Sequence, residues 1–90
     1  MTGSQAIAEA VAVSGLSLDA FAPMIGVSRT QLCGWVAQAR ADHEGKPWTG
    51  HVRRPSLDAV RCAVAVADEC VVAAAASVAR LKKLIDDGGL

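Results

Sequence analysis

Five side chains could do covalent or metal chemistry: Cys33, His43, His51, Cys62 and Cys70. A thiol beside an imidazole could act as a nucleophile with its base, and the same residue types bind zinc. These residues do not form ligand pairs of the usual spacing, and the chain has neither a Gly-rich phosphate loop nor an HExxH motif. A chain of 90 residues also leaves little room for a pocket. We therefore expect no enzyme activity, no metal and no cofactor.

The odd number of cysteines, with no CxxC pair, indicates reduced thiols. No signal peptide precedes them, so we expect a cytoplasmic protein. The longest nearly apolar run, residues 63–79, is interrupted by Asp68 and Glu69, and we expect it to be too short and too charged to span a bilayer. Neither a membrane nor a small-molecule substrate is an expected partner.

Positive charge is concentrated in one part of the chain, although the formal net charge is zero. Residues 1–27 contain two acidic residues and no Lys or Arg, whereas residues 28–61 contain six Lys or Arg against three Asp or Glu. A neutral chain is not expected to bind polyanions nonspecifically. Contact with an anionic partner is instead expected locally, within residues 28–61.

Residues 17–38 are expected to form two short helices joined by a tight turn. At the turn, Gly26 can adopt a positive φ and end the first helix. Ser28 is a favourable N-cap for the second helix, and Gln31 follows at the spacing of a capping box. Pro23 predicts a kink or a late start in the first helix. Apolar residues recur at helical spacing on both sides of the turn: Leu18, Phe21, Ala22 and Ile25, then Leu32 and Trp35.

This pattern resembles the helix-turn-helix of the lambda-repressor-like and Cro-like regulators of bacteria and phages. The matching residues are Ala22, Gly26, Val27, Ser28, Leu32 and Trp35, which lie within about a quarter of the chain. The resemblance implies an all-α fold in which a recognition helix, residues 28–39, enters the major groove of double-stranded DNA. It also implies that a leading helix packs across the motif, which we place at residues 5–13 after a Ser4 cap.

The DNA contacts implied by the resemblance come from the start of the recognition helix. Arg29 could bind a guanine or a phosphate, and Thr30 a thymine methyl or a phosphate. Gly34 would allow a close approach of the DNA, whereas Gln31 could contact a phosphate or serve only as a capping partner. The residues expected at the DNA are Ser28, Arg29, Thr30, Gln31, Cys33 and Gly34.

Residues 41–55 are expected to be irregular, because Gly45, Pro47, Gly50 and Pro55 exclude a long helix. One interpretation is a basic loop along the DNA backbone, with Trp48 pinning it to the core. The other is a short two-stranded wing over residues 46–54, as in excisionase-like winged helices; we favour the loop. The residues expected on phosphates are Lys46, Arg53 and Arg54. The Arg-Pro pair that leads into the next helix is also similar in layout to small phage autorepressors.

Residues 56–90 are expected to form one long helix, capped by Ser56 and stopped by Gly88 and Gly89, with a break at residues 68–69 as the alternative. An apolar heptad seam follows this helix through Leu57, Val60, Val64, Ala67, Val71, Ala74, Val78, Leu81 and Ile85. We expect residues 57–64 of the seam to close the core of the monomer. A second apolar strip, Ala63, Val66, Cys70 and Ala73, would permit this arrangement. The residues expected at a dimer interface are Val71, Ala74, Val78, Leu81 and Ile85.

The sequence thus predicts a helix-turn-helix DNA-binding domain, residues 1–55, followed by a dimerisation helix, residues 56–90. Such a chain would be a dimeric transcriptional regulator of phage or bacterial type, and we favour a repressor. Two recognition helices on a two-fold dimer would read two half-sites about one helical turn apart. One alternative is a protein-interaction module, such as an antitoxin or adaptor, whose long helix binds a different protein. The other is a winged-helix, excisionase-like architectural protein.

Overall fold

Each of the four helices follows a Ser or Thr whose side chain caps it. The hydroxyl oxygen accepts a hydrogen bond of 3.1 or 3.2 Å from the backbone N–H three residues on, and so satisfies an amide that a helix leaves unpaired at its start. The computed structural model describes residues 1–88, which contain no strand. The caps and helices are Thr2 for α1 (Gly3–Ser14), Ser17 for α2 (Leu18–Met24), Ser28 for α3 (Arg29–Glu44) and Ser56 for α4 (Leu57–Asp86).

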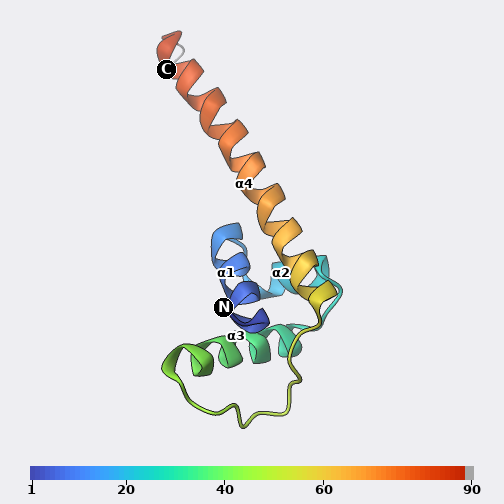
Figure 1. Ribbon diagram of the computed structural model, residues 1–90. Helices are drawn as coiled ribbons and strands as arrows, with labels where there is room; N and C mark the ends of the chain where they lie inside the picture. The colour runs from blue at the N-terminus through green and yellow to red at the C-terminus, as the bar shows by residue number, and fades with distance from the viewer. Residues whose placement is uncertain (89–90) are drawn as a thin grey trace.

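The expected all-α fold is confirmed over the described residues. Helix α1 packs against both α3 and α4, and α2 packs against α3. Figure 1 shows these three helices and the first turns of α4 gathered at one end, while the rest of α4 projects away from them. The molecule is accordingly elongated, with principal extents of 56 × 26 × 20 Å. We refer to residues 1–70 as the head and to residues 71–86 as the shaft.

Helix α1 begins earlier than expected, because Thr2 and not Ser4 is its cap. The Thr2 hydroxyl accepts from the backbone N–H of Gln5, and the Gln5 side chain accepts from the backbone N–H of Thr2 at 2.8 Å. This reciprocal capping box requires a Gln or Glu three residues after the cap, which Thr2 has and Ser4 lacks. Ser4 is instead fully buried inside the head. Gly15 ends the helix in a left-handed conformation.

The connection between α2 and α3 has the expected form. Gly26 has a φ of 73°, and the backbone N–H of Val27 bonds back to the carbonyl oxygen of Ala22 at 3.1 Å. The same carbonyl also accepts from the backbone N–H of Ile25 at 3.2 Å, so both bonds close the end of α2. Pro23 does not delay the start of α2, which begins directly after Ser17; it lies in the last turn, and the helix ends one residue later.

Helix α3 runs five residues beyond the expected end at Ala39. It continues to Glu44, where Gly45 closes it with a φ of 71°. Residues 40–44 contain no Gly or Pro, and Ala39 and Ala41 favour a helix, so nothing in this stretch stops it. The irregular segment is therefore shorter than expected and spans residues 45–56.

The core of the head joins all four helices. It is built from Ile7 and Ala10 of α1, Phe21 and Ala22 of α2, and Leu32 and Trp35 of α3, against Ala63, Val66 and Ala67 of α4. Val11, Leu18, Ile25 and Val27 are half-buried around this cluster. The apolar positions that helical spacing assigned to the core on either side of the turn are thus confirmed.

Helix α4 is continuous through Asp68 and Glu69. The residues with which it packs against the head differ in part from our expectation. Leu57 and Val64, which we expected in the core, are 63% and 51% exposed. The core is closed by Ala63 and Val66 of the second strip together with Ala67 of the seam, while Val60 and Cys70 are half-buried beside it. Small side chains allow α4 to lie close to α1, whereas Val64 stays exposed beside α1 and Leu57 is exposed at the start of the helix. Gly88 has a φ of 70° beyond the helix end, and Gly89 lies outside the described residues.

The shaft carries large apolar side chains with no cover. Val71, Val78, Leu81 and Ile85 are each between 47% and 62% exposed. We expected residues 63–79 to be too short and too charged to span a bilayer, but by length and composition α4 could cross one, since it contains an 18-residue window with a mean hydropathy of 1.8. Asp68 and Glu69 would then lie within the membrane, where an Asp at the centre costs about 3 kcal/mol. These exposed carboxylates favour a protein partner over lipid.

Candidate nucleic-acid interface

The outward face of α3 is the candidate interface. Leu32, Trp35 and Gln38 turn the opposite face of the helix into the core. Side chains that follow one another at helical spacing remain on the outside, and they include an arginine at the start of the helix and another three turns further on. Arg29, Thr30, Ala37 and Arg40 are exposed, and Cys33 is half-buried between them. This outward face has the length and shape that a major groove accommodates.

Arg40 was missed by the sequence analysis. It lies eleven residues after Arg29, three turns along α3, and therefore on the same side of the helix. No carboxylate within residues 1–88 pairs with it. The signal was available, since helical spacing from Arg29 through Cys33 and Ala37 leads directly to Arg40. We overlooked it because we ended the helix at Ala39.

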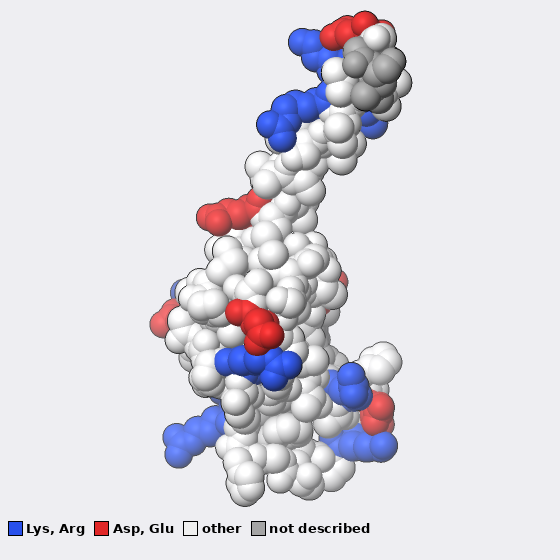
Figure 2. Space-filling view, turned by 180° about the vertical axis from the view of Figure 1, so that it is seen from behind, with Lys and Arg blue, Asp and Glu red and all other residues white. Residues whose placement is uncertain are grey.

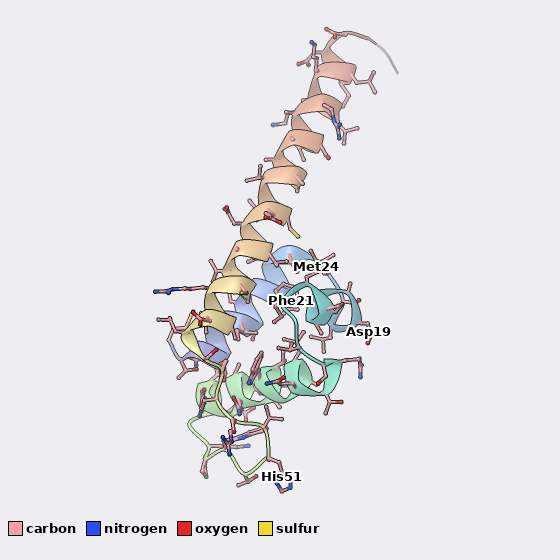
Figure 3. All side chains as sticks on the ribbon, turned by 90° about the vertical axis from the view of Figure 1, so that its right-hand side faces the viewer. Asp19, Phe21, Met24 and His51 are labelled. Atoms are coloured by element: carbon pink, nitrogen blue, oxygen red, sulfur yellow. The ribbon has the colours of Figure 1, made fainter. Side chains whose placement is uncertain are left out.

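Arg29 is held back towards α2 by an ion pair. Its Nε atom lies 2.7 Å from Oδ1 of Asp19, and the two side chains are 62% and 75% exposed. Figure 3 shows Asp19 at the surface of α2, while Phe21 points inward among the helices. An ion pair this exposed contributes about 0–1 kcal/mol. A phosphate or a guanine could therefore replace Asp19 as the partner of Arg29 at little cost.

Gly34 serves the chain's own loop. A Cβ atom built on Gly34 would lie 2.3 Å from Cγ2 of Val52, so the missing side chain leaves the space that Val52 fills. Val52 is half-buried there, beside the core. We expected DNA to approach Gly34 closely, but the loop of residues 45–56 lies against Gly34 instead.

Three hydrogen bonds fasten this loop to α3 and to itself. Nε1 of Trp35 donates to the carbonyl oxygen of Arg53 at 2.8 Å, and Nε2 of Gln38 donates to the carbonyl oxygen of Val52. Nε1 of Trp48 donates to the same Val52 oxygen at 3.0 Å. Trp48 thus stabilises the loop rather than pinning it to the core. Residues 45–56 contain no strand, so the wing alternative is not what forms here.

A second set of contacts joins the end of the loop to the last turn of α3 and to the start of α1. Both Nη atoms of Arg54 bond the carboxylate of Asp42, with Nη2 to Oδ1 at 2.7 Å, and the Thr2 hydroxyl donates to Oδ2 at 2.8 Å. The Arg54 hydrogen bonds, followed by the Thr2 bond, lower the pKa of Asp42 to about 2. Arg54 therefore acts first as a structural clamp.

The remaining loop cations are more open to a ligand. Arg53 is exposed, and no carboxylate within residues 1–88 pairs with it. Lys46 is exposed, and its Nζ atom lies 3.0 Å from Oε2 of Glu44. Figure 2 shows Lys and Arg side chains on both sides of the lower part of the head, and Figure 3 shows His51 pointing away from the helices at the outer end of the loop. These cations lie around α3 and not on one continuous patch.

Ser28, which we expected at the DNA, caps α3 by accepting from the backbone N–H of Gln31 at 3.1 Å. The Gln31 side chain is exposed and does not complete a capping box. Cys33, Cys62 and Cys70 are all free thiols. Within residues 1–88, no three His, Cys, Asp or Glu side chains lie close enough to hold a metal ion.

Comparison of the chain with protein-family models, with curated proteins and with solved structures finds no match.

Proposed function

We propose that this protein is a sequence-specific regulator that binds double-stranded DNA through α3 and acts as a homodimer in the cytoplasm, as a repressor of phage or bacterial type. The observation that carries the proposal is the outward face of α3, which presents Arg29, Thr30 and Arg40 beyond a four-residue turn of helix-turn-helix form. In such motifs the start of the second helix contacts base edges. Arg29 would read a guanine, and Arg53 and Lys46 would contact phosphates.

The experiment is a titration of the purified protein against the DNA upstream of its own coding sequence and against a scrambled control, at two salt concentrations. Specific binding should survive the higher salt, whereas binding by a basic patch alone would be equal on both DNAs and would vanish. Arg29→Ala should remove the preference for the upstream DNA without unfolding the head. Asp19→Ala is the matched control, since it breaks the same ion pair but leaves Arg29 free to bind.

A protein-interaction module is the second candidate, and the exposed shaft favours it. Val71, Val78, Leu81 and Ile85 form an apolar surface that a monomer would leave in water. A different protein could cover this surface, as in an antitoxin or adaptor. Sedimentation of the pure chain separates the two candidates: a clean homodimer supports the regulator, and a stable monomer that also ignores its upstream DNA supports the module.

A further inference from the structure

The exposed apolar seam of α4 extends the surface that already packs in the head, and its sequence contains information about the direction of a partner helix. Beyond Ala67 the seam continues through Val71, Ala74, Val78, Leu81 and Ile85 with no cover. Figure 2 shows that the middle of the shaft is free of charge, with an acidic side chain at its head end and basic side chains, followed by acidic ones, towards the tip. We propose that a second copy of this chain covers the seam in antiparallel orientation, with each tip against the other copy's head. The inference rests on the homodimer of the proposed function.

Side-chain volume favours antiparallel pairing. In a parallel pair, seam residues of the same number meet, so Ala67 and Ala74 would face their own copies in thin layers while Leu81 and Ile85 would face theirs in thick ones. In an antiparallel pair the two seam positions mix. One register then opposes Ile85 to Ala67, Val78 to Ala74, and Leu81 to Val71. Each layer has a larger and a smaller member, so the two helices can stay at one distance and leave no void.

Charge favours the same orientation and the same register. Asp68 and Lys82 lie along one edge of the seam, at equivalent positions two heptads apart. A two-fold axis across an antiparallel pair brings the same edge of both helices together. Asp68 of each copy would then meet Lys82 of the other, which gives two ion pairs. A parallel pair would instead place this edge against Ala63, Cys70, Ser77 and Leu84, which carry no charge.

The head offers a receiving surface where the tip of the second copy would arrive. A groove of about 240 Å³ runs between α1 and α4, lined chiefly by Ala6, Ala10 and Val13 of α1 and by Val64 and Ala67 of α4. Ala67, which the register opposes to Ile85, is itself only 7% exposed. Ile85 of the second copy would therefore contact the exposed side chains of Val64 and Val13, which line the same groove. The groove thus continues the seam across the head.

This pairing has a consequence for the proposed DNA site. The two heads, and with them the two α3 helices, would lie at opposite ends of the helix pair. A parallel pair would instead place the heads side by side at one end.

Charge reversal tests the orientation. Asp68→Lys and Lys82→Asp should each weaken dimerisation about ten-fold, measured by sedimentation equilibrium, because each creates two like-charged contacts. The double variant should return to within a few-fold of the parent. In a parallel dimer these residues are fourteen positions apart, about 21 Å, so no restoration would occur. Both side chains are exposed in the monomer, and far-UV circular dichroism would show that each variant stays folded.

Cross-linking provides a second measurement. In a background where the three native cysteines are alanine, chains with Asp68→Cys and chains with Lys82→Cys should form a mixed disulfide when combined, and neither should cross-link alone. Efficient cross-linking of Ile85→Cys alone, or a chain that sediments as a monomer, would overturn the antiparallel pairing. Neither measurement involves DNA, so its failure beside intact binding to the upstream DNA would remove the pairing and leave the proposed DNA-binding function standing.

Discussion

The Arg54 guanidinium bonds the Asp42 carboxylate through both of its Nη atoms, and so connects the end of the 45–56 loop to the last turns of α3. The Thr2 hydroxyl donates to the same carboxylate, so the start of α1 joins this contact. The loop is therefore held at Arg54 by a charged clamp and at Val52 and Arg53 by bonds to α3. A segment of twelve residues without regular structure is kept in one position relative to the candidate interface.

Acid should loosen this clamp in a defined pH window. The pKa of Asp42 is lowered from its ordinary 3.8 to about 2, so the carboxylate contributes stability above pH 4 and loses that contribution as the pH falls towards 2. Asp42→Asn should remove this part of the pH dependence. Urea denaturation of parent and variant at several pH values between 2 and 7 would measure it. Equal pH profiles for the two proteins would contradict the clamp.

Gly34→Ala should destabilise the head although alanine is the better helix former. The added Cβ would lie 2.3 Å from Cγ2 of Val52 and 2.7 Å from its Cβ. Overpacking of this kind costs about 1–3 kcal/mol, against a gain of about 1 kcal/mol in helix propensity. In a Val52→Gly background the same substitution should become neutral or stabilising. A double-mutant cycle by chemical denaturation checks this, and additive effects would show that the two residues do not touch.

Gln38→Leu should cost about 1–3 kcal/mol of stability, because it leaves a buried hydroxyl without a partner. The Ser4 Oγ atom donates to Oε1 of Gln38 at 2.6 Å, and both side chains are fully buried. Adding Ser4→Ala should recover most of the loss, since replacing both partners of a buried hydrogen bond is nearly neutral. Thermal denaturation of the two single variants and the double variant would test this. No recovery in the double variant would mean that Gln38 acts mainly through Val52.

The sequence alone predicted the local features well. The turn at Gly26, the caps at Ser28 and Ser56, and the inward position of Phe21, Leu32 and Trp35 each depend on a few neighbouring residues. Such features follow from residue types a few positions apart in the sequence, so they can be predicted without the structure. Thr2 was missed as a cap only because Ser4 also had an acceptable side chain, although the partner Gln5 pointed to Thr2.

The features that the sequence did not reveal depend on residues far apart in the chain. Ser4 meets Gln38, and Gly34 meets Val52, only after the helices have packed. Which side of α4 faces the head also depends on how α1 packs against it, since Ala63, Val66 and Ala67 are buried there while Leu57 and Val64 stay exposed. The loss of Arg54 from the expected phosphate contacts has the same origin, since Asp42 lies twelve residues away.

Arg53 and Arg54 should differ in their effect on DNA binding, although they are neighbours. Arg53→Ala should weaken binding to all sequences alike and reduce the slope of log K against log salt by about 1, as expected for one phosphate contact. Arg54→Ala should change the slope less, and should reduce stability, because Arg54 is already bonded to Asp42. Arg80→Ala, at the far end of α4, is the charge-matched control. Equal slopes for Arg53→Ala and the control would take Arg53 off the DNA.

Dimerisation should depend on which side of the shaft is altered. Val78 lies on the seam and Val72 lies off it, yet both are about half exposed in the single chain. Val78→Asp should raise the dimer dissociation constant by about 100-fold or more, because the charge would be buried between the copies, whereas Val72→Asp should leave it nearly unchanged. Sedimentation equilibrium measures both. If DNA is read by two heads together, the Val78 variant should also lose affinity for a two-half-site operator while keeping its affinity for a single half-site. Equal sensitivity of the two positions would show that the seam is not the surface through which this chain associates.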